Sequence, residues 1–268
     1  MTEAATLVER AEANAWKEII EAVPREFAAE HSIGTWRVEN GVGFRFDSPP
    51  NPFFNRFHGL GVLTQADAET LARAVAPWAG DGRTFVVHGV PDGVVPGLSA
   101  VLTGGGLSPG RNWVKMIRGT DAPPDIPSDL RIEEVGTEAS AAFASIAATA
   151  FELEGAEALF GAMVGRPGSH AYLAYDGSMP VATGYLRIED EVGWLGSGST
   201  LSSHRGRGAQ GAIMARRIAD GIKLGCRHLV SETGEETPEE PNPSYRNMLR
   251  TGFELVYARR NWIGTATG

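Results

Sequence analysis

The loop at residues 204–212 constrains this chain more than any other stretch; it reads His-Arg-Gly-Arg-Gly-Ala-Gln-Gly-Ala. It follows a strand-like run at 192–201 and opens a helical pattern at 212–224. Glycines at such a junction let backbone N–H groups approach a ligand, and a helix start adds unpaired donors and partial positive charge. Together they predict an anion site, most often for phosphate, and Arg205 and Arg207 suit phosphate geometry. The alternative is a glycine-rich turn with surface arginines.

A second motif narrows the ligand. The loop lacks the Gly-Lys-Ser/Thr of a P-loop, and it lies too late in the chain for a dinucleotide fingerprint. Downstream, residues 242–253 form a helical stretch that ends in Gly252-Phe253. In this order the two motifs resemble the acetyl-CoA loop, Arg/Gln-x-x-Gly-x-Gly/Ala, and the late helix of the GCN5-related N-acetyltransferases (the GNAT family). Arg205 and Gly208 match that loop, whereas Gln210 stands in place of its last Gly/Ala, as in one subgroup of the family.

The order of predicted elements extends the resemblance over residues 130–263. It implies an α/β (α+β) fold, the acyl-CoA N-acyltransferase fold, with a mixed, mostly antiparallel twisted sheet flanked by helices. The expected strands are 130–135, 170–175, 180–188, 191–201 and 227–231, the expected helices are 137–151, 156–164, 212–224 and 244–251, and a closing hairpin is expected at 253–263.

The first half follows the same plan in faded form, with strands at 57–63 and 84–88 and helices at 66–78 and 96–103, but without a second arginine-glycine loop. A proline-rich stretch separates the halves and is typical of a linker. We therefore predict two tandem copies: a degenerate GNAT-like domain at 1–120 that does not bind the cofactor, a linker at 121–129 and a catalytic domain at 130–268. The alternative is an unrelated α+β accessory domain.

Composition excludes several other classes. A net charge of −9 argues against a nucleic-acid partner. The N-terminus is an amphipathic acidic helix rather than a signal peptide, and no apolar run is long enough to cross a membrane, so we expect a cytoplasmic protein. The single cysteine, Cys226, is expected to be a buried hydrophobe, and the histidines show no metal-ligand spacing. A homodimer is compatible with the sequence, which carries no signal of oligomeric state.

The resemblance implies that acetyl-CoA binds between two splayed parallel strands, 191–201 and 227–231. Main-chain N–H groups of the loop would hold the pyrophosphate, with Arg205 and Arg207 reaching a phosphate, and the Leu201 N–H would polarise the thioester carbonyl. Asn242 would contact the pantetheine. The predicted cofactor-binding residues are Ser199, Thr200, Leu201, Arg205, Gly206, Arg207, Gly208, Ala209, Gln210, Gly211, Asn242 and Ser244.

The catalytic residues are less evident from the sequence. Many family members carry a tyrosine acid four residues before the glycine of Gly-Phe, where this chain has Met248. Ser244 and Tyr245 are the candidate acids, although Ser244 could instead cap a helix, Tyr245 could simply pack, and no dedicated acid need exist. Glu232 is the first candidate base because it ends the strand beside the cofactor; the alternative is an exposed strand-end glutamate.

These features predict an acetyl-CoA-dependent N-acetyltransferase that acts by direct transfer on a primary amine of a small molecule or a protein N-terminus. A silent CoA-binding sensor or interaction protein is the alternative, since the usual tyrosine is missing. Nucleotide binding by the loop is a third interpretation. The identity of the acceptor amine is not readable from the sequence.

Overall fold

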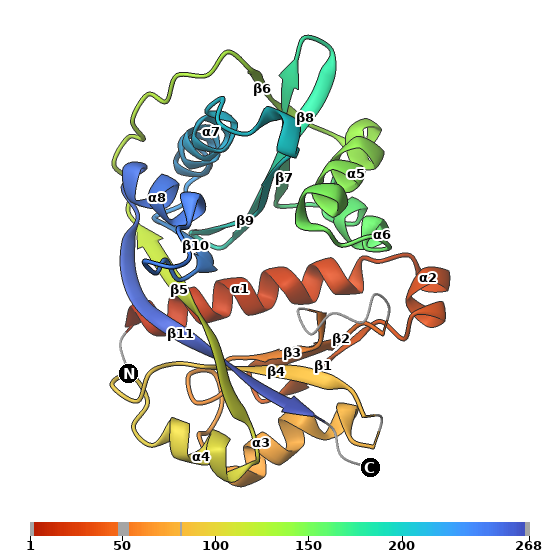
Figure 1. The fold of residues 1–268 in the computed structure, drawn as a ribbon, viewed down its shortest axis with the longest axis vertical. Coiled ribbons are helices and arrows are strands. Elements are labelled where there is room, and N and C mark those ends of the chain that lie inside the picture. Colours follow the sequence, from red (N-terminus) through yellow and green to blue (C-terminus); the bar gives the residue numbers. More distant parts are fainter. Residues whose placement is uncertain (1–2, 48–53, 81, 266–268) are drawn as a thin grey trace.

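The computed structural model describes residues 3–47, 54–80 and 82–265. Its strands join in one sheet with the order β1-β2-β3-β4-β11-β5-β10-β9-β8-β7-β6 (Figure 1). The pairs β3–β4 and β9–β10 are parallel, and the other neighbouring pairs are antiparallel. The strands are β1 (Gly34–Val38), β2 (Gly41–Arg45), β3 (Arg56–His58), β4 (Thr84–Gly89), β5 (Ser108–Arg118), β6 (Arg131–Val135), β7 (Ser169–Asp176), β8 (Met179–Glu189), β9 (Val192–Thr200), β10 (His228–Gly234) and β11 (Glu254–Thr265).

Helices pack on this sheet, and some of them connect its strands. The α-helices are α1 (Glu3–Glu21), α2 (Arg25–Glu30), α3 (Ala68–Val75), α4 (Leu98–Gly104), α5 (Ser140–Phe151), α6 (Glu157–Gly161), α7 (Ala209–Lys223) and α8 (Pro243–Arg250), with 3-10 turns η2 (Ala76–Trp78), η3 (Thr137–Ala139) and η4 (Ser202–His204). None of the helices in the described ranges has the length and apolar character needed to span a membrane. The predicted mixed, mostly antiparallel sheet flanked by helices is confirmed.

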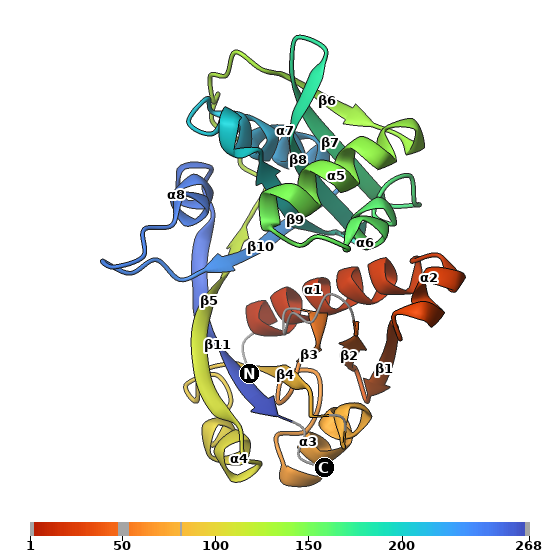
Figure 2. The same cartoon turned by 45° about the vertical axis from the view of Figure 1, so that its right-hand side comes forward.

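The two halves share one order of elements, except that β6 has no counterpart among the described residues of the first half, and they exchange their last strands. In the first half α3 connects the parallel pair β3–β4, and in the second half α7 connects β9–β10. β5 ends the first half but pairs with β10 of the second, while β11 ends the second half and pairs with β4 of the first. β5 and β11 also pair with each other and run from one half to the other (Figure 2). A division at 121–129 therefore follows the chain but leaves one shared sheet.

Helix α1 lies between the two halves (Figures 1 and 2). Its apolar face is buried, as with Val8, Trp16 and Ile19. The same face carries Glu9 and Glu12, which are 1% and 0% exposed. A buried carboxylate needs a cationic partner, and here Arg259 of β11 pairs with both, at 3.0 and 2.5 Å.

Some local predictions need correction. The closing hairpin expected at 253–263 is a single long strand, β11, because its partners are β4 and β5 from the first half. Strands β1 and β2 were not predicted. Cys226 is buried, as expected.

Candidate functional site

The site is built where the parallel strands β9 and β10 part. Their pairing runs from Val192 and His228 to Leu195 and Ser231 and stops there, although β9 continues to Thr200. Beyond the last pair, β9 bulges: its register against β8 jumps between Gly196 and Ser199, and Ser197 has a φ of 46°. A bulge re-aims backbone groups and bends the strand away from its neighbour. This leaves a gap between the two strands.

A cavity of about 830 Å³ lies over the start of α7. The helix begins at Gly208, whose φ is 78° and which provides no side-chain cap. A Cβ at this position would lie 2.7 Å from the Pro127 carbonyl oxygen, so glycine is required. The uncapped first turn directs N–H groups and the positive end of the helix dipole toward the cavity. These features fit a phosphate group of a nucleotide-like cofactor.

Nine of the predicted cofactor residues line this cavity. They come from the end of β9, the loop, the first turn of α7 and the start of α8: Ser199, Thr200, Arg205, Gly206, Gly208, Ala209, Gln210, Gly211 and Ser244. Leu201, Arg207 and Asn242 are not among its lining residues.

The two loop arginines differ in their partners. Arg205 lines the cavity, and its Nε lies 3.4 Å from the Thr200 carbonyl oxygen. Arg207 instead pairs with Asp129 and with Asp176, the latter at 2.6 Å. Its side chain therefore anchors the loop to the linker and to β7. The expected reach of this guanidinium to a phosphate is replaced by these two ion pairs.

The Leu201 N–H is not available for a thioester carbonyl. It donates to the Val181 carbonyl oxygen at 3.0 Å, because the hydrogen bonding between β8 and β9 continues one residue past the end of the strand. Gly198, in the bulge, is the better candidate for a contact to the thioester carbonyl, because it lines both this cavity and a second cavity that adjoins it. Gln210 holds the bulge, since its Nε2 donates to the Ser199 and Thr183 carbonyl oxygens at 2.7 and 3.1 Å.

Helix α8 is positioned by Asn242. Its Oδ1 accepts from the N–H groups of Ser244 and Tyr245, and its Nδ2 donates to the Gly234 carbonyl oxygen at 2.6 Å. Asn242, rather than Ser244, is thus the N-cap, and it ties α8 to the splayed end of β10. Ser244 is exposed and lines both cavities, whereas Tyr245 packs against the apolar cluster under α7 and lines neither. The placement favours Ser244 over Tyr245.

A second cavity, of about 420 Å³, adjoins the first. The two share four lining residues: Phe151, Gly198, Gln210 and Ser244. The second cavity continues into the gap between β9 and β10 and contains Glu232. A ligand anchored at α7 can therefore extend along the bulge toward Glu232.

Glu232 is a buried carboxylate rather than an exposed strand-end group, with a side chain only 6% exposed. Its Oε2 accepts from Lys115 Nζ at 3.1 Å and from Trp194 Nε1 at 3.0 Å. Burial raises the pKa of Glu232, the nearby charge of Glu12 raises it further, and Lys115 acts in the opposite direction. A carboxylate with a raised pKa is a better proton acceptor near neutral pH.

Several residues of this region were missed from the sequence. Lys115 of β5 bridges Glu232 to Glu12, whose Oε2 it meets at 2.8 Å. Burial alone would raise the pKa of Glu12, but the charges of Arg259 and Lys115 outweigh it and hold this pKa well below its usual range. Arg217 of α7, 2% exposed, donates to the Tyr185 and Gly196 carbonyl oxygens beside the bulge at 3.0 Å. No short motif marks them, because they come from distant parts of the chain.

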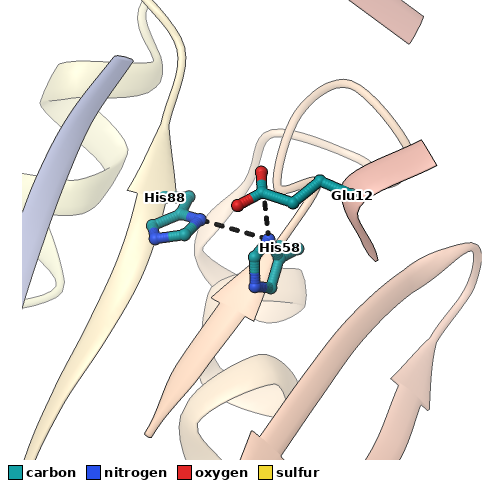
Figure 3. A group of neighbouring side chains, drawn as sticks. All are labelled: Glu12, His58 and His88. Carbon is teal, nitrogen blue, oxygen red and sulfur yellow. Dashed lines mark hydrogen bonds and ion pairs between the residues drawn. The ribbon is translucent and has the colours of Figure 1, made fainter. Parts of the chain in front are cut away.

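Three buried side chains of the first half could in principle hold a metal: Glu12, His58 and His88 place one donor atom each within 4.8 Å of one another (Figure 3). The two Nδ1 atoms of the histidines are 3.2 Å apart, so one ring donates to the other. The Glu12 carboxylate already accepts from Lys115 and Arg259. Two buried cations beside the group oppose a further cation, so the donor set fits a hydrogen-bonded network better than a metal centre.

Comparisons with solved structures assign the fold. A GCN5-related N-acetyltransferase from Kribbella flavida superposes with a TM-score of 0.60 over 94% of this chain and 96% of that one, at 20% identity. A tandem GNAT protein from the clavulanic acid biosynthesis pathway gives 0.59 over 99% and 95%, at 15% identity. A GCN5-related N-acetyltransferase from Sphaerobacter thermophilus gives 0.58 over 96% and 92%, at 13% identity.

No protein-family profile matches the sequence, and a search of curated proteins finds no relative. The structural comparisons, which each cover both halves, therefore stand on the arrangement of the backbone alone. The chain has the fold of the GCN5-related N-acetyltransferases.

Proposed function

We propose that this chain transfers the acetyl group of acetyl-CoA to a primary amine, on a small molecule or at a protein N-terminus. One observation carries the proposal: a cavity over the uncapped start of α7 adjoins a second cavity that holds the buried carboxylate of Glu232. The first suits the phosphates of CoA, and the second suits an amine that must lose a proton. When bound, acetyl-CoA supplies an activated acyl group.

The residues divide the work as follows. Main-chain N–H groups at the start of α7, together with Arg205, hold the pyrophosphate. Asn242 orients α8 so that Ser244 lies at the junction of the cavities. The bulge at Gly198 places backbone groups of β9 beside the acyl group, and Gln210 and Arg217 brace that bulge. Preorganised donors of this kind stabilise the charge that develops on a carbonyl oxygen.

The transfer balances in protons and electrons. Glu232 accepts the first proton of the ammonium group and so frees the nitrogen lone pair. The nitrogen then forms the C–N bond to the acetyl carbon as the C–S bond breaks, and the bonding pair leaves on sulfur. Ser244 passes its proton to that sulfur and regains a proton from the nitrogen, which thereby gives up its second proton. The products are the amide, the free thiol and one proton that Glu232 releases to solvent.

The test is direct. The protein is incubated with acetyl-CoA and a panel of primary amines and peptides; free thiol is measured by a colorimetric assay and N-acetylated product by mass spectrometry. We expect both products in equal amounts for at least one acceptor. Tight binding of CoA, with no product from any member of a broad panel, would instead favour a CoA-binding sensor.

A further inference from the structure

The second cavity has a distinctive wall. Five aromatic side chains line it, from α1, β5, α5, α6 and β9: Trp16, Trp113, Phe151, Phe160 and Trp194. Its volume of about 420 Å³ falls in the range typical of small-molecule sites. Such a wall favours a ligand whose body is flat and apolar, since each ring offers a large apolar face.

Four of these five rings pack on other aromatic rings. Trp16 meets Trp194 edge to face at 5.9 Å and stacks on Phe44 at 5.8 Å. Phe151 stacks on Phe160 at 5.8 Å. Trp194 is also held by its hydrogen bond to Glu232. A preformed pocket binds its ligand with little loss of side-chain entropy.

One carboxylate in the wall, Glu232, can meet a cationic head group through Oε1, while Lys115 pairs with its Oε2. The charged side chains that line the cavity are Glu232 and Arg217. Arg217 directs Nη1 to two main-chain carbonyl oxygens. Glu232 Oε1 accepts only the shared Trp194 N–H among the hydrogen bonds of the described residues, at 3.1 Å, which leaves it room to accept from an ammonium group. The Arg56 guanidinium lies 5.8 Å from the Trp16 and Trp113 ring centroids, so these two rings are offered to the apolar body of a ligand rather than to its cation.

We propose that the acceptor is a small primary amine carried on an aromatic body, such as an arylalkylamine. This inference rests on the proposed acetyl transfer. The ammonium group would lie against Glu232, and the ring would lie among Trp16, Trp113 and Phe160. The first half would thus act in specificity, because Trp16 and Trp113 both belong to it. A peptide N-terminus or a polyhydroxylated amino sugar would leave polar groups unpaired against these rings.

Turnover tests the choice of acceptor. Initial rates are measured with acetyl-CoA and 2-phenylethylamine, tryptamine, spermidine, glucosamine or an N-terminal octapeptide. We expect kcat/KM for the two arylalkylamines to exceed the others by at least about tenfold, the order expected for one buried ring. Efficient acetylation of spermidine, glucosamine or the peptide with no acetylation of the arylalkylamines would overturn the inference and leave the proposed function standing.

Binding is measured separately, so that the two proposals can fail independently. Calorimetric titration of 2-phenylethylamine into the protein saturated with CoA should show one site per chain. Binding without any acetylated product would contradict the proposed function but support the aromatic acceptor pocket. No binding and no turnover of arylalkylamines would overturn the pocket.

Variants of Trp113 test whether the aromatic ring of the acceptor lies against this side chain. Trp113→Leu should raise the KM for 2-phenylethylamine at least about fivefold, whereas Trp113→Phe should restore it, because a ring rather than a particular side chain is required. Trp36→Leu is the matched control: this tryptophan packs against Trp78 in the first half and does not line the cavity. Equal KM changes in Trp113→Leu and Trp36→Leu, or no change in Trp113→Leu, would contradict the placement.

Discussion

The helices α3 and α7 occupy corresponding places in the two halves, yet they begin in opposite ways. α7 starts at Gly208 with no side-chain cap, over a cavity. α3 is capped by Asp67, whose carboxylate accepts from the Thr70 N–H at 2.7 Å. A carboxylate already occupies the anion site of α3 and repels a second anion. One side chain thus separates a helix start that is open to an anion from one whose anion site is already filled.

The loops before these helices differ in the same sense. Gly59 and Gly61 both have positive φ, as Gly206 and Gly208 do. In the first half, however, the loop bonds to itself: the Leu63 N–H donates to the Gly59 carbonyl oxygen at 2.7 Å, and the Gly61 N–H donates to Thr64 Oγ1 at 3.2 Å. Donors satisfied within the loop are not available to a ligand.

The gaps between the parallel strands show a third contrast. Glu232 follows the last parallel pair of β10, and His88 follows the last parallel pair of β4. Around Glu232 the strands part and a cavity remains. Around His88 the space is filled, since this ring bonds to His58 and both are 2% exposed or less (Figure 3). We infer that the corresponding gap of the first half is filled by side chains. The first half contributes β5 and α1 to the site of the second half.

The largest effect is expected at the open gap. Glu232→Gln should lower kcat by about 100-fold or more, the usual contribution of a general base, with CoA affinity unchanged. Burial raises the pKa of Glu232, so activity of the parent should rise with pH through a value above that of an ordinary glutamate. The variant should lack this rise in a kcat–pH profile. Glu235→Gln is the control, because Glu235 bonds to Asn112 and lines neither cavity; equal losses in both variants would contradict a base at Glu232.

The second-largest effect is expected when a carboxylate is placed in the loop before α7, as Asp67 places one at the start of α3. At Gly206 a Cβ meets nothing within 4 Å, but the φ of 82° strains any side chain there; Asp and Asn share this strain, so comparing them isolates the charge. A unit charge about 5 Å from another repels it by about 3 kcal/mol at an effective dielectric constant near 20. Gly206→Asp should therefore weaken CoA binding about 100-fold in calorimetry, whereas Gly206→Asn should weaken it only slightly. Similar affinities for the two variants would show that the phosphates lie elsewhere.

Features that depend on residues close together in the sequence could be predicted, whereas contacts between residues far apart in the sequence could not. The loop, α7 and the Gly252-Phe253 end of α8 follow from local patterns, and so does the fold class. The exchange of β5 and β11 does not, because strand pairing between halves leaves no local pattern. Leu201 shows the same limit: its N–H is used by β8, and a single residue of strand register decides that. Trp16 and Lys115 reach the site only through tertiary packing.

The two loop arginines should differ by a smaller amount. Arg205→Met should weaken CoA binding about tenfold, since a charge-assisted hydrogen bond to phosphate is lost. Arg207→Met should weaken it less and lower the Tm instead, because Asp129 and Asp176 lose their partner. Calorimetry and thermal denaturation of both variants check this order. A larger loss of affinity in Arg207→Met would reverse the assignment of the two side chains.

The smallest effect is expected at His58 and His88, which fill the space beside the parallel pair β3–β4. Burial lowers the pKa of both His58 and His88. The unfolded chain then binds protons first as the pH falls below about 6.5, so stability is lost on acidification, by up to about 1.4 kcal/mol per pH unit for each such group. His88→Asn should show a shallower loss of unfolding free energy from pH 7 to pH 5 in urea titrations. His228→Asn, at an exposed position, should match the parent; an unchanged slope in His88→Asn would contradict a buried neutral pair.

We predict a single cofactor site in the chain, at the start of α7 in the second half. Calorimetric titration of CoA into the intact protein tests it most directly, because it counts sites without any acceptor. We predict one CoA per chain, lost in Gly206→Asp and retained in Gly206→Asn. Two CoA molecules per chain, or one that binds Gly206→Asp with unchanged affinity, would contradict a single site at the start of α7.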